Sequence, residues 1–197
     1  MKEKTSGDGG LGVEILVTIV IIAIIMAIAV WLFIAKQGDA DFEFKVNERT
    51  EFKLVDQTEK TATFSCEVAF INKGSQDGTI MDAYPRHLLP YEQFDGVDVN
   101  SRMELTTALR TDNYFEAVII PKGTGGIVIV TVTFTAKTGN IKDALQNLYD
   151  LSVDMPIDIV YQIVARTPWY IHKARMIMSC DEINRAMQAK GTAKWEG

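Results

Sequence analysis

The sequence IVIVTVTFTA, residues 127–136, alternates between two kinds of side chain. Successive side chains of a β-strand point to opposite faces, so every second residue shares a face. One face is apolar and consists of Val128, Val130, Val132, Phe134 and Ala136. The other face carries Thr131, Thr133 and Thr135. This alternation predicts a strand with one face in a core and the other against water or a neighbouring sheet edge.

Eight further segments have strand character, because each is rich in β-branched and aromatic residues and is bounded by turn residues. The predicted strands are Asp41–Asn47, Glu51–Asp56, Ala62–Asn72, Thr79–Leu88, Val97–Leu105, Asn113–Pro121, Ile127–Lys137, Met155–Thr167 and Trp169–Ser179. Gly74–Gly78 and Lys122–Gly126 supply two of the turns between them. Nine short strands at nearly regular spacing predict a mainly β fold, an antiparallel β-sandwich or barrel.

Two helices are predicted beside the strands. The inserted helix runs from Asn140 to Tyr149, with Asn140 as its N-cap. Its apolar residues recur at helical spacing and are Ile141, Ala144, Leu145 and Leu148. A short C-terminal helix begins at Ser179, because Ser179 and Glu182 have the spacing of a capping box. Beyond Lys190 we expect a loosely held tail.

The N-terminal part has a different composition. Residues Ile15–Ile34, with the sequence ILVTIVIIAIIMAIAVWLFI, contain no charge, Gly or Pro. At about 1.5 Å per residue, a helix of this length spans about 30 Å, the thickness of a bilayer's hydrocarbon core. Trp31 and Phe33 lie near its end, where aromatic rings favour the membrane interface. We therefore predict three parts, namely an arm over 1–14, a transmembrane anchor over 15–36 and a single domain over 37–197.

The anchor is predicted to stay on the chain, because a cleaved signal peptide has an apolar core of only about 7–15 residues. Its orientation follows from the positive-inside rule, which counts Lys and Arg beside the span. Lys2 and Lys4 precede it and Lys36 follows it. This balance favours a cytoplasmic N-terminus. We expect a single-pass protein of the cell membrane with an extracytoplasmic domain, a layout usual for bacterial signal-anchored proteins.

The charge balance excludes some partners. The chain has 20 Lys and Arg against 26 Asp and Glu, a net charge of −6, and no basic run. Nucleic acids and anionic lipid surfaces are both bound by clustered Lys and Arg. We therefore expect no nucleic-acid partner. The expected partners are the bilayer and other membrane or envelope proteins, a second copy of this chain included.

No pattern in the chain specifies a reaction or a cofactor. His87 and His172 are the only histidines, and no nucleophile motif accompanies them. The acidic segment Tyr91–Asp98 lacks the dense Asp and Asn alternation of a calcium-binding EF-hand. The glycines of Gly123–Gly126 precede a strand, whereas a phosphate-binding loop leads into a helix. We predict no catalytic, cofactor-binding or metal-binding residue, and hence no enzyme.

The two cysteines, Cys66 and Cys180, belong to no CxxC or Cys/His zinc pattern. Cys66 shares a strand face with Phe64, Val68 and Phe70, which favours a small core residue. In an oxidising compartment the two thiols also have the option to pair, which would stabilise the fold by about 4–5 kcal/mol through loop closure. The sequence leaves both states open.

Two segments have the composition of protein-contact sites, which favour amphipathic residues such as Tyr, Trp and Arg. The first is Met81–Tyr91, whose two prolines argue against a central strand. The second is Thr167–Ile171. The candidate contact residues are Tyr84, Arg86, His87, Tyr91, Trp169 and Tyr170. The pair Leu88-Leu89 fits a core position equally well.

Two turns resemble those of bacterial immunoglobulin-like and LEA-type extracytoplasmic sandwiches. One is the strand, Asn-x-Gly turn and strand of Val68–Gly74 and Gly78–Ile80. The other is the proline-glycine hairpin Ile119–Gly123, which leads into Val128–Val132. The resemblance covers Ala62–Ala136. It implies an immunoglobulin-like or LEA-like fold that serves as a binding or scaffolding module.

A further resemblance concerns the N-terminus. Gly9–Glu14 is similar to a type IV prepilin junction, in which cleavage after Gly9 places Glu14 at the fifth mature position. A pilin continues as a long amphipathic helix, whereas here Gly38 and strand spacing follow the anchor. Our interpretation is therefore a non-catalytic interaction or accessory subunit of a membrane or envelope complex. The alternatives are a pilin-like filament subunit, a carrier of an apolar ligand or lipid, and an enzyme with its site in the loops.

Overall fold

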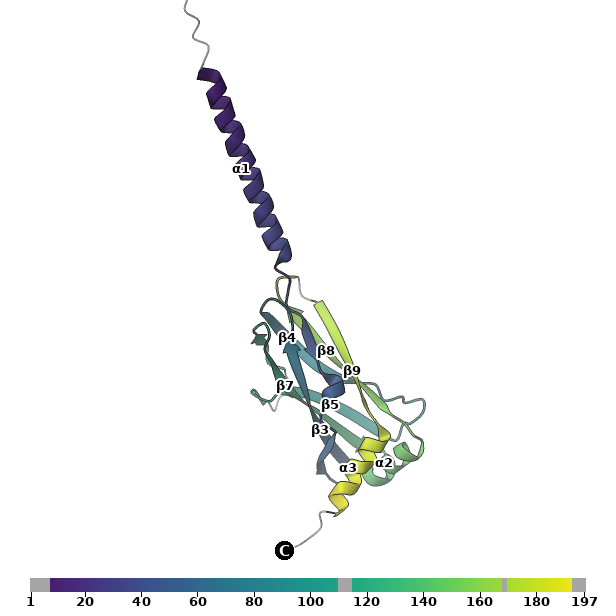
Figure 1. The fold of residues 1–197 in the computed structure, drawn as a ribbon. Helices are drawn as coiled ribbons and strands as arrows, with labels where there is room; N and C mark the ends of the chain where they lie inside the picture. Colours follow the sequence, from purple (N-terminus) through teal and green to yellow (C-terminus); the bar gives the residue numbers. More distant parts are fainter. Residues whose placement is uncertain (1–7, 110–114, 168–169, 193–197) are drawn as a thin grey trace, which may run out of the picture. The chain divides into compact units, whose positions relative to one another are not determined.

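The computed structural model describes residues 8–109, 115–167 and 170–192 (Figure 1). Residues 1–38 and 39–197 form two separate compact units. The first contains the helix α1, Asp8–Lys36. The second contains all the strands of the described chain and the helices α2 (Ile141–Asp150) and α3 (Cys180–Thr192).

Among the described residues, α1 is the one helix whose length and apolar composition would allow it to cross a membrane. It begins at Asp8, so the described part of the predicted arm is helical, and it ends at Lys36 as predicted. The predicted anchor residues Ile15, Trp31, Phe33 and Ile34 lie in it, and their side chains are exposed. Gly38 then has a φ of 47°, a conformation that glycine adopts without steric strain. The chain therefore leaves the helix over only Gln37 and Gly38.

Sheet A is built around two long antiparallel strands, β3 (Thr61–Asn72) and β7 (Gly125–Ala136). β5 (Val97–Leu105) pairs with the other edge of β7. β1 (Phe42–Phe44) and β2 (Lys53–Gln57) both pair with β3. The apolar face predicted for β7 is buried throughout. The alternation in the sequence therefore predicted which face of this strand lies in the core.

Sheet B has four antiparallel strands in the order β6, β4, β8 and β9. Their bounds are Val118–Ile120, Gly78–His87, Met155–Val164 and Tyr170–Met178. β6 pairs only with the first three residues of β4. In β8, the consecutive residues Ile157, Asp158 and Ile159 are all buried, although they point alternately to the two faces of the sheet. A carboxylate is thus enclosed on the face of sheet B that points away from the core.

The two sheets share one hydrophobic core. Phe44 of β1 packs against Phe70 of β3 and Tyr161 of β8, with ring centroids 5.3 and 4.6 Å apart. Phe64 and Phe134 meet edge to face at 5.8 Å. Aromatic side chains therefore fill much of the space between the sheets, where such contacts add to the stabilisation by apolar burial.

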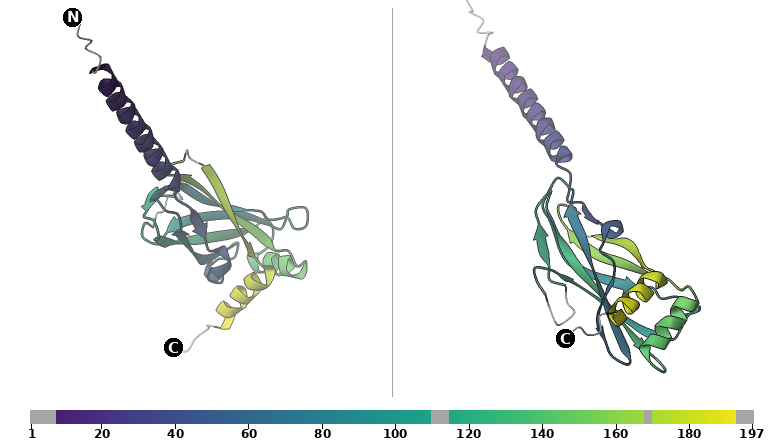
Figure 2. Two further views of the ribbon diagram at one scale, coloured as in Figure 1. Left: turned by 45° about the horizontal axis from the view of Figure 1, so that its top comes forward. Right: turned by 60° about the horizontal axis from the view of Figure 1, so that its bottom comes forward.

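α2 and α3 pack against each other at one end of the second unit (Figure 2). Asn140 caps α2 as predicted, because its side-chain oxygen accepts a hydrogen bond from the N–H of Asp143 at 2.9 Å. The predicted apolar stripe of α2 is buried. The hydroxyl of Ser179 accepts the N–H of Glu182 at 3.2 Å at the start of α3. α3 continues past Lys190 to Thr192, and the rest of the predicted tail lies outside the described residues.

Strand bounds needed correction in three places. The predicted strand Asp41–Asn47 is β1 followed by a 3₁₀ helix, η1 (Val46–Glu48). The N–H of Glu48 donates to the carbonyl of Lys45 at 3.0 Å, and this turn ends the strand although the alternation continues. The predicted strand Met155–Thr167 ends at Val164 in the structure, because the N–H groups of Arg166 and Thr167 donate to the carboxylate of Asp39 and not to a neighbouring strand. Asn113–Pro121 is reduced to β6, and its first two residues lie outside the described part.

Pro85 lies within β4, which is an interior strand of sheet B. β6 pairs with Gly78–Ile80 only, so among the residues that the structure describes Pro85 has a strand neighbour on one side only. Its carbonyl accepts a hydrogen bond from the hydroxyl of Ser101 on β5 at 3.0 Å. The segment Met81–Tyr91 thus does include part of an interior strand, but Pro85 lies where that strand has an edge, as expected for a residue without an N–H to donate. Leu89 is buried in the core, as the alternative interpretation of Leu88-Leu89 expected.

Candidate protein-contact surface

The face of sheet B that points away from the core is the candidate surface, called here the outer face of sheet B. Tyr84 lies opposite Val160 on β8, and Arg86 lies opposite Asp158. Tyr84 is 51% exposed, and Arg86 is exposed as well. The structure therefore brings two of the six predicted contact residues together on one face, because they are two positions apart on one strand.

Asp158 organises the cations of this face. Its carboxylate is buried and accepts two hydrogen bonds from Arg175 on β9, at 2.6 Å from Nε and 3.0 Å from Nη2. Lys173 Nζ lies 3.5 Å from the same carboxylate. The hydrogen bonds from Arg175 lower the pKa of Asp158, although burial opposes them. Two cations thus bind one carboxylate, and Arg86 lies opposite Asp158 in the register of β4 and β8, in a chain of net negative charge.

His87 does not belong to this face. Its Nδ1 lies 3.1 Å from the hydroxyl oxygen of Ser101, which itself donates to the carbonyl of Pro85. The hydroxyl proton is thereby engaged, so Nδ1 of His87 is the donor in the first contact. Burial lowers the pKa of His87. The residue joins β4 to β5 and is a structural contact between the sheets.

The remaining predicted residues lie elsewhere. Tyr91 is exposed, and Lys137 Nζ stands 5.5 Å from its ring centroid. Tyr170 is half-buried, its hydroxyl donates to the carbonyl of Ala40 at 3.2 Å, and burial raises its pKa. Its ring also meets His172 at 4.6 Å. Trp169 lies outside the described residues.

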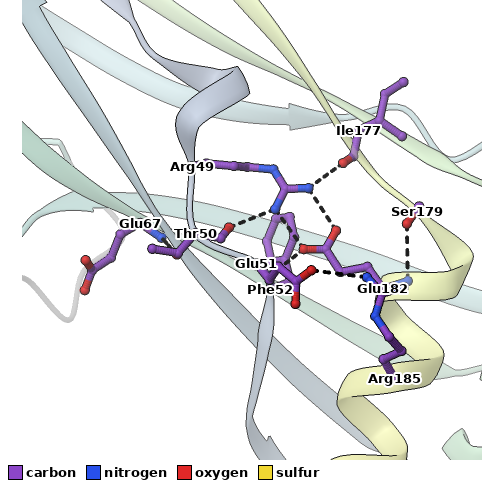
Figure 3. A network of polar contacts seen from close by, with 9 residues as sticks. All are labelled: Arg49, Thr50, Glu51, Phe52, Glu67, Ile177, Ser179, Glu182 and Arg185. Atoms are coloured by element: carbon purple, nitrogen blue, oxygen red, sulfur yellow. Dashed lines mark hydrogen bonds and ion pairs between the residues drawn. The ribbon is translucent and has the colours of Figure 1, made fainter.

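A second carboxylate cluster, absent from the sequence-based prediction, joins three elements (Figure 3). The guanidinium of Arg49 binds both oxygens of Glu182 at 2.8 Å and donates to the carbonyl of Ile177 at 2.7 Å. Glu182 also accepts the N–H of Phe52 at 2.5 Å. Burial opposes ionisation, but these donors lower the pKa of Glu182. The cluster ties the segment between η1 and β2 to β9 and α3.

The sequence places Glu182 in a capping box with Ser179. Ser179 does cap α3, but the carboxylate of Glu182 binds Arg49. Arg49 is 133 positions earlier in the chain, so no local pattern pointed to it. For Asp158 a signal did exist, since a lone acid in the apolar run MPIDIV is unusual in a strand.

Asp39 fixes the start of the second unit. Its carboxylate accepts the backbone N–H groups of Ala40, Arg166 and Thr167 at 2.8, 3.0 and 2.8 Å, and also the hydroxyl of Thr167. The hydroxyl of Thr167 contributes most to lowering its pKa to about 2. A Cβ on Gly74 would lie 2.4 Å from the carbonyl oxygen of Asp39, so only glycine fits beside it. The first residues after Gly38 are thus held firmly in the domain.

The two cysteines are buried inside the second unit. Cys66 and Cys180 are both buried and free, so they do not form a disulfide in this structure. Burial raises the pKa of Cys66 to about 12, which keeps the thiol protonated at neutral pH. Within residues 8–109, 115–167 and 170–192, no group of three or more His, Cys, Asp or Glu residues is placed to hold a metal ion.

Comparison with known proteins adds little. No protein-family profile and no curated protein match the sequence. Among solved structures, the chain is similar to target SoR45 of the Northeast Structural Genomics Consortium, with a TM-score of 0.36 and 11% identity over 71% of this chain and 85% of that one. For a protein from Archaeoglobus fulgidus the TM-score is 0.33, with 7% identity over 69% and 96%. For the GAE domain of GGA2p from Saccharomyces cerevisiae it is 0.26, with 8% identity over 64% and 96%. At such TM-scores the likeness carries no inference about function.

Proposed function

We propose that this chain is a membrane-anchored, non-catalytic subunit that presents an immunoglobulin-like or LEA-like sandwich to a partner protein on the extracytoplasmic side. The observation that carries the proposal is the outer face of sheet B. Tyr84 and Arg86 stand exposed there beside cations that the buried Asp158 holds in place. Tyr and Arg are the residue types enriched where protein interfaces are strongest.

The arrangement around Asp158 supports binding in a second way. Long cationic side chains lose conformational entropy when a partner immobilises them. The carboxylate already orients Arg175 and Lys173, so part of that loss has occurred before a partner arrives. Arg175 is still 52% exposed and Lys173 63% exposed, which leaves their outer hydrogen atoms available. Preorganised cations of this kind favour a partner with complementary charge.

The position of the anchor supports a partner near the membrane. Only Gln37 and Gly38 separate the apolar helix from Asp39, which is already tied into the domain. Two residues span at most about 7 Å, so we expect the partner within reach of the bilayer, among membrane or envelope proteins. A cytoplasmic N-terminus and an extracytoplasmic domain are part of the proposal.

The alternatives have less support. A pilin-like subunit needs a helix that continues beyond the membrane, whereas α1 ends at Lys36. A carrier of an apolar ligand needs space between the sheets, whereas Phe64, Phe134 and Ile159 fill the core. For the enzyme alternative, His87 and both cysteines are taken up in packing contacts.

Migration of the native complex tests the proposal. The full chain, tagged and expressed at its natural level, is extracted in mild detergent and separated by blue-native electrophoresis. We expect wild type in a complex larger than the chain alone, and we expect the double variant Tyr84→Ala/Arg86→Ala to migrate alone. Tyr91→Ala, which removes an exposed tyrosine elsewhere, is the matched control and should stay in the complex. A wild-type chain that migrates alone would contradict the proposal.

A further inference from the structure

The strand β9 forms an open edge of sheet B. It pairs with β8 from Tyr170 to Met178, and no other strand of the described chain pairs with its second edge. The 3₁₀ helix η1 packs beside β9, and Val46, Asn47 and Arg49 line a cleft together with Arg175, Met176 and Ile177. An added strand would therefore lie mainly along Ile171 and Lys173 and reach Arg175 at the mouth of this cleft. Unpaired N–H and C=O groups along such an edge are able to accept a further strand. The edge lies beside the outer face of sheet B, so both belong to one continuous surface.

The contact with Arg49 shows which backbone groups point outward. Arg49 donates to the carbonyl of Ile177, so this carbonyl points away from β8. Opposite it stands Pro156, which has no N–H to donate across the ladder. Alternate residues of a strand direct their backbone groups to the same side. Ile171, Lys173 and Arg175 therefore direct N–H and C=O groups outward, and within the described residues no backbone hydrogen bond meets them.

The side chains of these residues give the edge its chemistry. Ile171, Lys173, Arg175 and Ile177 share the outer face, and each is more than half exposed. Lys173 and Arg175 are two positions apart and are oriented by Asp158. A strand added to β9 would place its own side chains directly opposite them. Acidic residues with the same two-residue spacing would therefore meet both cations.

We propose that the β9 edge binds an extended segment of another protein that carries two acidic residues separated by one position. This inference rests on the proposed function and names the chemistry of the partner. Strand addition supplies main-chain hydrogen bonds, and the acidic pair supplies register and specificity. Pairing of β9 with a second copy of itself is disfavoured, because registers centred on Lys173 and Arg175 place cation opposite cation.

The probe is a fluorescein-labelled ten-residue peptide of alternating threonine and valine with glutamate at its fifth and seventh positions. The control peptide has the same composition, with the glutamates at the fifth and sixth positions, so that they point to opposite faces. Binding to the full chain in nanodiscs of neutral lipid is followed by fluorescence anisotropy. We expect the control peptide to bind at least tenfold more weakly, and we expect the affinity of the first peptide to fall with added salt.

Two variants separate the backbone from the charge. Ile171→Pro removes one outward N–H that makes no bond to β8, whereas its matched control Ile171→Ala keeps that N–H and removes a similar apolar surface. We expect the proline variant to bind at least tenfold more weakly than the alanine variant. Lys173→Thr keeps the backbone and removes one cation, and we expect an intermediate loss. Far-UV circular dichroism verifies that each variant retains the fold.

Equal binding of Ile171→Pro and Ile171→Ala would overturn the proposal. So would equal binding of the two peptides, because it would show a charged surface with no strand addition. The complex on the native gel distinguishes this inference from the proposed function. If Ile171→Pro loses the peptide but keeps the native complex, the edge is not what the partner uses, and the proposed function stands. If wild type binds the peptide but migrates alone, the proposed function fails and the edge proposal stands.

Discussion

Glu182 and Asp158 are two buried carboxylates that each bind an arginine, yet their partners differ in exposure. In the first pair, the side chain of Arg49 is 14% exposed and that of Glu182 is 6% exposed. In the second, Asp158 is 4% exposed, but Arg175 is 52% exposed. The donors of Arg49 are directed to Glu182, Thr50 and Ile177 within the chain. The first pair is therefore a structural clamp, and the second offers part of its charge to a partner.

The comparison also explains why the two clusters have different neighbours. Glu182 is enclosed where three elements meet, so the pair supports the position of α3. Asp158 lies beneath the outer face of sheet B, where β4 and β9 flank β8. A buried ion pair contributes little net stability compared with an apolar pair, but its two halves depend on each other. When one residue of the pair is replaced, the loss of stability should therefore be larger the more deeply its former partner is buried.

The largest expected effect comes from Glu182→Ala. It leaves the guanidinium of Arg49 without its carboxylate in a buried site, so we expect the free energy of unfolding to fall by about 3–5 kcal/mol. Urea unfolding of the full chain in detergent micelles, followed by circular dichroism, measures the change. Glu182→Gln keeps hydrogen-bonding atoms in place and should lose less. If Glu182→Ala lost less free energy of unfolding than Asp158→Ala, the distinction between a structural Glu182 cluster and a binding Asp158 cluster would be wrong.

Asp158→Ala should have a smaller effect on stability, about 2 kcal/mol, because Arg175 and Lys173 become hydrated when their carboxylate is gone. Its effect on binding should be larger in proportion, since the two cations lose their fixed orientation. The same urea titration and the migration of the native complex measure the two quantities. A variant that unfolds easily but keeps the complex would show that Asp158 serves the fold alone.

Asp39 provides a third carboxylate, which accepts hydrogen bonds from three backbone N–H groups and one hydroxyl. Its folded-state pKa of about 2 lies below the ordinary value of 3.8, so its contribution to stability is present above pH 4. Protonation removes that contribution as the pH falls from about 4 to 2. We expect Asp39→Ala to lose about 1 kcal/mol at neutral pH, after allowance for partial exposure, and to show less dependence on pH in this window. Parallel acid dependence of the variant and wild type would assign the acid sensitivity to other groups.

The smallest effect is expected for Glu51→Ala. Glu51 pairs with Arg185 at 3.3 Å, but both side chains are mostly exposed. Solvent screens such a pair, so the urea midpoint should move very little. The variant lies close to the Glu182 cluster and is therefore its matched control (Figure 3). A large shift would mean that charge at this site matters more than burial.

The fold was more predictable from the sequence than the candidate surface. Local patterns determine where α1 ends, which face of β7 is buried and how Asn140 caps α2, so these predictions are confirmed. Composition pointed to Tyr84 and Arg86 but also to His87, which the structure places in a contact with Ser101. The difference arises because successive residues of a strand point to opposite faces.

The charge clusters depend on register and on distant contacts. Asp158 meets Arg175 because β8 and β9 pair in one particular register, and the sequence does not specify that register. Arg49 meets Glu182 only through the packing of α3. In the same way, the alternation of apolar residues extends to Val46 in the sequence, but β1 ends at Phe44 because the N–H of Glu48 bonds to the carbonyl of Lys45 and forms a turn.

Hydrogen exchange of the full chain, free and within its native membrane complex, tests the central claim most directly. The account predicts slower exchange in the complex at β4 and β9, and above all at the outward amides of Ile171, Lys173 and Arg175. Sheet A should exchange at the same rate in both states. Protection confined to sheet A, with β9 unchanged, would contradict the claim that the outer face of sheet B binds the partner.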